Sequence, residues 1–242
     1  KQMPVQEKFN LLLMRRIIVV SGASRGIGRA IVDSLAQNSE ILVIALSRDI
    51  NTLSQHFGQR SNVRCVKFDL SLDPEQQLRQ SLVDLNEIHG LINNAGHLEK
   101  GDFNELSQEA YERCLKVNFL GPIALTSFLY SRLSKGKAHV VNISTMGAFQ
   151  GSVKFPGLSA YAASKAAICN FTEVFAEEQK LSGIRMNCLC LGSVNTEMLQ
   201  AAFPGYQATT SPEEMGNFIA DFTLNQGSIF NGKIIPVSST TP

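Results

Sequence analysis

A glycine-rich turn near the start of the chain restricts its fold more than any other segment. Residues 21–28 read Ser-Gly-Ala-Ser-Arg-Gly-Ile-Gly, after the apolar run 17–20 and before the amphipathic stretch 29–35. Glycines let the backbone approach a pyrophosphate closely, and a helix that starts there offers unpaired N–H groups to the anion. The order of strand, turn and helix therefore predicts an anion-binding turn, although the G-x-x-x-G-x-G spacing alone also fits a turn without a ligand.

Strand-like and helix-like segments alternate along the rest of the chain. The expected strands are 17–20, 41–46, 63–68, 88–92, 138–143, 184–190 and 232–237. The expected helices are 26–38, 50–57, 74–85, 107–131, 159–182 and 212–225. Strand 41–46 is apolar throughout, which is typical of a strand covered on both faces. We therefore predict an α/β fold, a Rossmann-like, doubly wound three-layer α/β/α sandwich around a parallel seven-stranded sheet.

Two long connections, 146–158 and 193–211, follow the ends of expected strands. Open α/β sheets bind ligands at the carboxyl ends of their strands, so these connections are the expected substrate walls. Their large apolar side chains favour an apolar or aromatic ligand over a sugar phosphate, although some of them can simply pack the loops onto the sheet. These side chains are Met146, Phe149, Phe155, Leu158, Met198, Leu199, Phe203 and Tyr206.

Length and charge exclude several classes of protein. A chain of 242 residues suits one α/β domain, which we place at 14–242, and we interpret 1–13 as a leader or a cloning remnant. The net charge is +1 without a basic run, so neither a nucleic acid nor an anionic membrane is an expected partner. No apolar run approaches the roughly 20 residues of a membrane span.

The five cysteines lie in apolar segments without a Cys-x-x-Cys spacing. This usage predicts free, buried thiols in a reducing cytoplasm. Cys188 and Cys190 alternate along an expected strand and should face the same side of the sheet. The histidines are scattered, and no cluster of histidine, cysteine and acid indicates a metal site, so we expect none.

Four further motifs occur along the chain in a distinctive order. They are Asn93-Asn94-Ala95-Gly96 after an expected strand, Asn118 in a helical pattern, Asn142-Ile143-Ser144-Thr145 at a strand end, and Tyr161-Ala162-Ala163-Ser164-Lys165 at a helix start. With the glycine turn, they resemble the short-chain dehydrogenase/reductase family from about Arg15 to about Val237. The C-terminal strand and the compact 193–211 region are more weakly similar to the sepiapterin reductase and benzil reductase branch.

Transfer of a hydride to or from a carbonyl carbon requires a proton at the carbonyl oxygen. A tyrosine suits this step if its pKa of about 10 is lowered, and Lys165, four residues after Tyr161, lies on the same helix face and can lower it. We therefore expect Tyr161 as the general acid/base. The resemblance implies that Lys165 also binds the nicotinamide ribose, that Thr145, with Ser144 as the alternative, positions the carbonyl oxygen, and that Asn118 supports a proton relay.

The end of the second expected strand bears on the choice between NAD and NADP. Ser47 stands where an acid would hold the ribose 2′-hydroxyl, Arg48 follows it, and Arg25 lies in the glycine turn. Two guanidinium groups favour a 2′-phosphate, so we predict NADP(H), although Asp49 would favour NAD after a register shift of one residue. The motifs and the resemblance together imply these cofactor-binding residues: Gly22, Ser24, Arg25, Gly26, Ile27, Gly28, Arg48, Asp69, Leu70, Asn94, Ala95, Gly96, Tyr161, Lys165, Val194 and Thr196. In the segment 191–196, which contains Val194 and Thr196, Leu191 stands before Gly192 where the family usually has a proline.

The resulting prediction is an NADP(H)-dependent oxidoreductase that transfers a hydride between nicotinamide and a carbonyl or secondary alcohol. Its expected substrate is an apolar or aromatic ketone or diketone, since no aspartate for anchoring a pteridine is evident near 234–242. A catalytically silent, NADP(H)-binding regulatory member of the family is the alternative. An epimerase or dehydratase that retains its cofactor is a further one, although such relatives are usually longer. The resemblance also implies a homodimer or homotetramer formed through 107–131 and 159–182.

Overall fold

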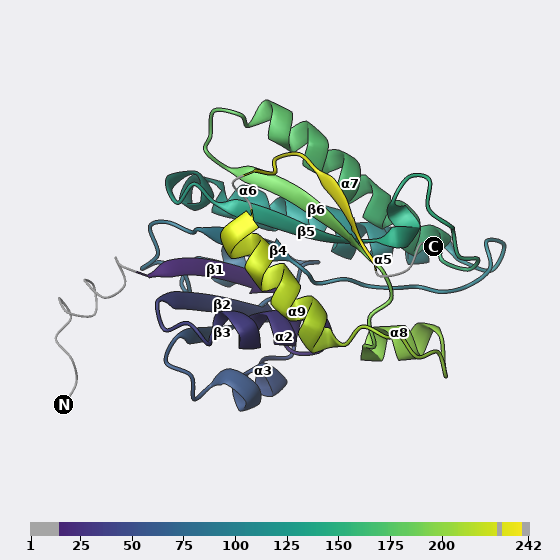
Figure 1. The fold of residues 1–242 in the computed structure, drawn as a ribbon, viewed down its shortest axis with the longest axis horizontal. Coiled ribbons are helices and arrows are strands. Elements are labelled where there is room, and N and C mark those ends of the chain that lie inside the picture. The colour runs from purple at the N-terminus through teal and green to yellow at the C-terminus, as the bar shows by residue number, and fades with distance from the viewer. Residues whose placement is uncertain (1–14, 227–228, 239–242) are drawn as a thin grey trace.

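The computed structural model describes residues 15–226 and 229–238, so the expected leader lies outside the described residues. The chain forms one parallel sheet of seven strands in the order β3-β2-β1-β4-β5-β6-β7, with helices on both faces (Figure 1). The strands are β1 (Arg16–Ser21), β2 (Ile41–Ser47), β3 (Val63–Lys67), β4 (Gly90–Asn93), β5 (His139–Thr145), β6 (Arg185–Leu191) and β7 (Ile234–Val237). The main helices are α2 (Gly26–Leu35), α3 (Ile50–Phe57), α4 (Pro74–Leu78), α5 (Gln108–Leu115), α6 (Gly121–Lys135), α7 (Ser159–Glu178), α8 (Glu197–Ala202) and α9 (Pro212–Asp221). The predicted Rossmann-like fold is confirmed.

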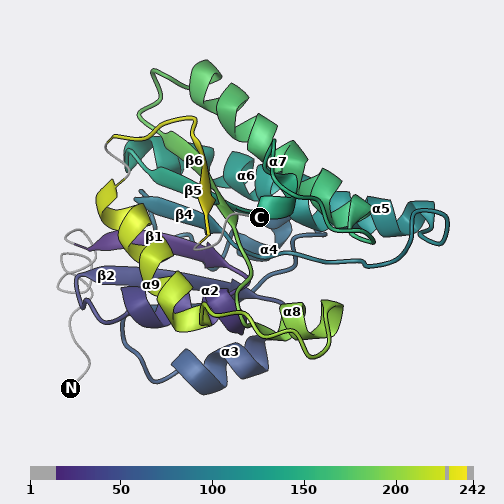
Figure 2. The same ribbon diagram turned by 45° about the vertical axis from the view of Figure 1, so that its right-hand side comes forward.

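The side chains of β1 explain why helices cover both faces of the sheet. Ile17 and Val19 belong to one apolar cluster, which they share with α4, α6 and α7. Ile18 and Val20 belong to a second cluster, shared with α2, α3 and α9. Because successive side chains of a strand point to opposite faces, a strand that buries all four residues needs a helical layer on each side. Figure 2 shows these two layers on either side of the sheet.

The single helix expected at 107–131 is divided by a π-helical turn, η1 (Lys116–Leu120), between α5 and α6. Pro122 has no N–H group and cannot donate the helical hydrogen bond to the carbonyl of Asn118, four residues earlier. The side chain of Asn118 is buried and hydrogen-bonds outside the helix. The irregular turn therefore coincides with a predicted site residue, as is frequent for π-helical turns.

Two other predicted segments need correction. The helix expected at 74–85 ends at Leu78, although Leu82 and Leu85 stay buried in the turns that follow. The apolar period thus continues without a continuous helix. The connection 193–211 contains the short helix α8, whose N-terminus is capped by the hydroxyl of Thr196. No helix in the described part of the chain is long and apolar enough to cross a membrane.

Candidate active site

A cavity of about 520 Å³ opens at the carboxyl ends of the strands. The glycine turn, the ends of β2, β4, β5 and β6, the first turns of α7 and the segment around α8 form its walls. Every predicted cofactor-binding residue lines this cavity, and so do three of the four predicted catalytic residues, Thr145, Tyr161 and Lys165. Asn118 lies behind the wall rather than in it. The fold therefore gathers residues that are more than 170 positions apart in sequence around one space.

The glycine turn closes one end of the cavity. Gly22 has a φ of 71°, and a Cβ built on it would lie 2.7 Å from the Cα of Ala95. A Cβ on Gly28 would lie 2.0 Å from the carbonyl oxygen of Gly22. Only glycine fits these positions. No side chain caps the N-terminus of α2 at Arg25, so its first N–H groups remain available to an anion in the cavity.

Two neighbouring asparagines fix the end of β4. Asn94 donates from Nδ2 to the carbonyl oxygens of Ser21 and Gly22, at 3.1 and 3.2 Å, and so ties β4 to the glycine turn. Asn93 is buried and donates to Oδ1 of Asn142 at 2.8 Å, inside the sheet. Asn94 lines the cavity, whereas Asn93 lies inside the sheet and links β4 to β5.

The end of β2 presents arginine, not acid, to the cavity. Arg25 and Arg48 both line it, next to Ser47, the last residue of the strand. Asp49 instead caps α3, where its carboxylate accepts hydrogen bonds from Oγ1 of Thr52 at 2.7 Å and from its N–H at 3.0 Å. These bonds hold the pKa of Asp49 below its ordinary value. Asp49 is therefore bound within α3 and is not among the residues that line the cavity.

Asp69 lies on the neighbouring wall. Burial by itself would raise the pKa of its carboxyl group, but hydrogen bonds from the backbone and side chain of Ser71, at 2.8 and 2.7 Å, outweigh this effect. The nearby charge of Arg48 acts in the same direction, and the pKa of Asp69 is lowered. The carboxylate therefore stays charged at neutral pH and available to an amino group.

Tyr161 and Lys165 occupy the start of α7, one helical turn apart. Nζ of Lys165 donates to the carbonyl oxygen of Ile143 at 2.8 Å, and burial lowers its pKa to about 8. Burial raises the pKa of Tyr161 to about 12. The expected lowering of this pKa by Lys165 is therefore not found, because the loss of solvent around the hydroxyl disfavours the tyrosinate more strongly.

The two hydroxyls at the end of β5 have different partners. Ser144 is buried and donates from Oγ to the carbonyl oxygen of Lys165 at 2.9 Å. Oγ1 of Thr145 accepts a hydrogen bond from the N–H of Gly147 at 3.3 Å, its only bond to the described residues. The Thr145 hydroxyl therefore keeps its hydrogen for a ligand in the cavity, whereas that of Ser144 is used within the protein.

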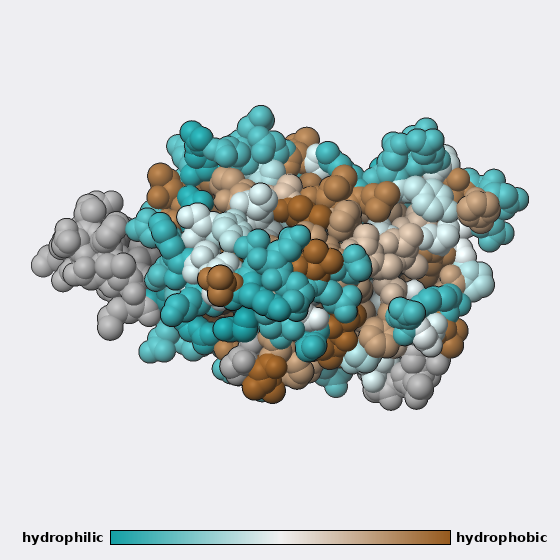
Figure 3. All heavy atoms as spheres, turned by 90° about the horizontal axis from the view of Figure 1, so that it is seen from above, coloured by the Kyte–Doolittle hydropathy of each residue, from teal (hydrophilic) through white to brown (hydrophobic). Residues whose placement is uncertain are grey.

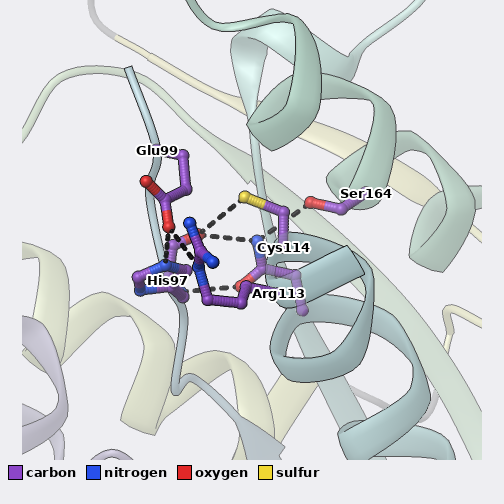
Figure 4. A network of polar contacts seen from close by, with 6 residues as sticks. His97, Glu99, Arg113, Cys114 and Ser164 are labelled. Atoms are coloured by element: carbon purple, nitrogen blue, oxygen red, sulfur yellow. Dashed lines mark hydrogen bonds and ion pairs between the residues drawn. The ribbon is translucent and has the colours of Figure 1, made fainter. Parts of the chain in front are cut away.

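Asn118 joins three segments behind the cavity. Its Oδ1 accepts from the N–H of His97 at 2.7 Å, and its Nδ2 donates to the carbonyl oxygen of His97 at 2.8 Å and to Oγ of Ser164 at 2.9 Å. The imidazole of His97 contacts Glu99, which also binds Arg113 (Figure 4). The side chain of Asn118 thus holds the loop after β4 against α7.

The two connections that we expected to form the substrate walls are joined at a residue that the sequence analysis did not single out. Nζ of Lys100 donates to the carbonyl oxygen of Ala202 at 2.7 Å and lies 4.2 Å from the ring centre of Phe203. The next residue, Gly101, donates from its N–H to the carbonyl oxygen of Gly157 at 3.0 Å. The loop after β4 is therefore a third wall, which its place at a strand end could have suggested.

The predicted apolar lining is present with one exception. Phe149 does not line the cavity and packs instead against a buried cluster around Cys169. The other seven predicted side chains do line it: Met146, Phe155, Leu158, Met198, Leu199, Phe203 and Tyr206. Although sequence spacing indicated no metal ligands, the fold brings the thiols of Cys169, Cys188 and Cys190 within 4.8 Å of one another. As predicted, Cys188 and Cys190 face the same side of β6, where both thiols meet that of Cys169.

A glycine turn, a parallel sheet and a tyrosine–lysine pair around one cavity define an oxidoreductase of the dinucleotide-binding α/β class. Residues 16–207 match the family described as short chain dehydrogenase, and the chain belongs to this family.

Two curated relatives come from bacteria. The chain is 30% identical to acetoacetyl-CoA reductase of Rhizobium meliloti, with 78% of each chain covered. It is 26% identical to the 3-oxoacyl-[acyl-carrier-protein] reductase FabG of Aquifex aeolicus, with 93% of this chain and 97% of the relative covered.

A solved structure shows the same fold. It is the 3-ketoacyl-(acyl-carrier-protein) reductase from Brucella melitensis complexed with NADH, with a TM-score of 0.82 and 20% identity. The similarity covers 92% of this chain and 96% of that one.

Proposed function

We propose that the protein is an NADP(H)-dependent carbonyl reductase of apolar or aromatic ketones or diketones, with Tyr161 as the general acid/base. One observation carries this proposal: Thr145, Tyr161 and Lys165 line the same cavity as the anion-binding glycine turn. A proton donor, a positioning hydroxyl and a dinucleotide cradle therefore share one cavity, as reduction of a bound carbonyl group would require.

The residues around the cavity fit a nicotinamide dinucleotide that carries a 2′-phosphate. The uncapped start of α2 suits its pyrophosphate, and the exposed guanidinium groups of Arg25 and Arg48 suit the 2′-phosphate. Asp49, the acid that would favour the 2′-hydroxyl, is committed to its helix cap. When bound, the nicotinamide supplies a hydride to the carbonyl carbon or accepts one from the alcohol.

Three side chains of the protein bind the carbonyl oxygen, protonate it or stabilise the charge that results. Thr145 donates a hydrogen bond to this oxygen, and Tyr161 transfers its proton to it as negative charge develops. With a pKa of about 12, Tyr161 is protonated at neutral pH, which is the form that reduction requires. Lys165, with a pKa of about 8, is largely charged at pH 7 and stabilises the tyrosinate that forms. Reduction should therefore slow as the pH rises past the Lys165 pKa.

The lining of the cavity favours an uncharged substrate. Its charged side chains in the described part of the chain are Arg25, Arg48, Asp69, Lys165 and Glu197. The first three lie in the cofactor half, and the carboxylate of Glu197 lies beside the glycine turn, 3.4 Å from a Cβ built on Gly26. The lining around Phe155, Leu158 and Phe203 supplies apolar surface, and the nearby ammonium group of Lys100 lies outside this lining, bound to the carbonyl oxygen of Ala202.

The test is NADPH oxidation, followed by the absorbance of the reduced nicotinamide, with a panel of diketones, aromatic ketones and 3-oxoacyl thioesters. We expect turnover of the diketones and aromatic ketones that Tyr161→Phe lowers by at least about 100-fold, the lower range for loss of a general acid. Tyr130→Phe removes a hydroxyl on α6 that bonds Gln179 outside the cavity, so it is the matched control and should leave turnover unchanged. Turnover restricted to thioesters would overturn the substrate class, and tight NADPH binding without any turnover would favour a regulatory member.

Further variants assign the two hydroxyls of β5. Thr145→Ala should lower kcat, whereas Ser144→Ala should mainly lower stability, because its hydroxyl bonds the backbone of α7. The reverse result would give Ser144 the catalytic position.

We also propose self-association into a dimer or tetramer through α5, α6 and α7. Exposed apolar side chains on these helices and on η1 support it, among them Leu115, Leu120 and Val174. Hydrophobic areas also lie among hydrophilic ones on the face shown in Figure 3. Light scattering after gel filtration will give the mass, and a monomer would refute the proposal. The free thiols support a location in the reducing cytoplasm.

A further inference from the structure

Three cysteines that the proposed reaction does not use meet between α7 and β6. Sγ of Cys169 lies 3.7 Å from Sγ of Cys188 and 3.7 Å from Sγ of Cys190. All three residues are buried, and their sulfur atoms lie within 4.8 Å of one another. Cys188 and Cys190 are two positions apart on β6, and Cys169 faces them from the helix.

The surroundings of these thiols are apolar except where Ser144 and Lys165 contact Cys169. Met146, Ile168 and Ile234 pack around the sulfur atoms, and the rings of Phe149 and Phe171 lie outside them. Oγ of Ser144 lies 3.3 Å from Sγ of Cys169. Sγ of Cys169 also donates to the carbonyl oxygen of Lys165, one helical turn earlier, at 3.2 Å.

The spacing of the sulfur atoms matches that of ligands around one metal ion. With a Zn–S distance of about 2.3 Å, tetrahedral geometry places neighbouring sulfur atoms about 3.8 Å apart. Two of the pairs in this cluster are separated by 3.7 Å. A disulfide would join only two of the three thiols, whereas a metal ion uses them all. The hydroxyl oxygen of Ser144, 3.3 Å from Sγ of Cys169, is close enough to supply a fourth ligand.

Charge balance favours a divalent ion over a monovalent one. Three thiolates and a divalent cation carry one net negative charge, whereas a monovalent cation would leave two negative charges in an apolar interior. Zinc and cadmium are divalent, prefer thiolate ligands and accept four-coordinate geometry.

We propose that Cys169, Cys188 and Cys190, with Ser144 in the fourth position, bind a divalent thiophilic cation, zinc being the physiological one. The ion ties the helix that carries Tyr161 to β6. It enters where the four-residue edge strand β7 covers the cluster with Ile234, because a short edge strand opens more readily than the interior of the sheet.

The test is a titration of the whole, reduced, metal-free protein with Cd²⁺, followed by the thiolate-to-cadmium charge-transfer absorbance. Zn²⁺ is measured by competition with a chromophoric chelator, and native mass spectrometry counts the ions. We expect one ion per chain and a higher melting temperature in its presence. Cys188→Ala should weaken binding by more than about 100-fold, because even residues behind the ligands cost 10–100-fold. Cys65→Ser removes a thiol outside the cluster and should leave affinity unchanged.

Cys190→Ser provides a second variant of nearly native size in case Cys188→Ala does not fold, and it should weaken binding in the same way. Equal affinity in the wild type and in a folded cluster variant would overturn the proposal. So would a reduced protein that binds no ion but loses two hydrogens from the cluster with oxidised glutathione, since it would show a disulfide pair instead.

Discussion

The buried histidine at the start of β5 should make the protein acid-sensitive to a calculable degree. Nδ1 of His139 donates to the carbonyl oxygen of Thr223 at 3.1 Å, and Nε2 accepts from Nδ2 of Asn187 at 2.9 Å. Only the neutral ring satisfies both partners, because Asn187 presents a donor. Burial is the main reason why the pKa of His139 falls from 6.5 to about 4.

The sign and size of the effect follow from this pKa. The unfolded chain takes up the proton near pH 6.5, whereas the folded protein does so only near pH 4. The free energy of unfolding is therefore fully retained above pH 6.5 and falls as the pH drops toward 4. Between pH 7 and pH 5 the loss from this one group is about 2 kcal/mol, since each unit of pKa difference corresponds to about 1.4 kcal/mol.

Urea unfolding at several pH values measures this loss. His139→Gln keeps a donor for Thr223 and an acceptor for Asn187 but does not titrate, so its stability should decline less between pH 7 and pH 5, by the amount calculated above. His56→Gln, which removes a largely exposed histidine, is the control and should follow the wild type. If the free energy of unfolding declined equally with falling pH in the wild type and in His139→Gln, the reasoning would be refuted.

Three further predictions concern the cavity. Arg48→Ala should raise KM for NADPH by about 10- to 100-fold, the worth of a charged hydrogen bond, and leave KM for NADH unchanged; an equal rise for both cofactors in steady-state kinetics would contradict the 2′-phosphate site. Gly28→Ala places a Cβ 2.0 Å from the carbonyl oxygen of Gly22, so it should abolish NADPH binding in calorimetry and destabilise the fold by about 3 kcal/mol or more; native-like binding would argue against the turn as described. Lys100→Met removes the bond to Ala202 and should speed proteolysis of the α8 segment by several-fold, with little effect on the melting temperature; unchanged cleavage would show that the loops are held by other contacts.

The order of elements and the position of the glycine turn in the cavity wall could be predicted because both depend on local patterns. An apolar run such as 17–20 predicts a strand, and the spacing of the glycines predicts the turn that follows it. Which of the adjacent residues Arg48 and Asp49 lines the cavity could not be predicted in this way, since it depends on a single residue of register. Asp49 is withdrawn from the cavity by a helix cap, and only the structure shows which of two adjacent side chains has that role.

Features that depend on packing between distant segments escaped the sequence analysis for a different reason. The alternation of side chains along a strand predicted that Cys188 and Cys190 share one face of the sheet. No local pattern indicated that Cys169, on α7, packs against that face. The pKa of Tyr161 was misjudged because the i, i+4 spacing reveals the nearby lysine and not the burial of the hydroxyl. The turn at Asn118 replaces part of an expected helix because Pro122 interrupts the backbone ladder there.

The junction of the three loops at Lys100 has a consequence for how the substrate range of this protein can change. Each wall of the cavity is anchored to another, through the carbonyl oxygens of Ala202 and Gly157. A substitution that shifts one wall therefore also shifts the walls anchored to it. The effects of paired substitutions in two walls should be non-additive even where the substituted side chains do not touch. Laboratory evolution of this protein toward a new substrate would advance faster by varying the three loops together than by improving them in turn.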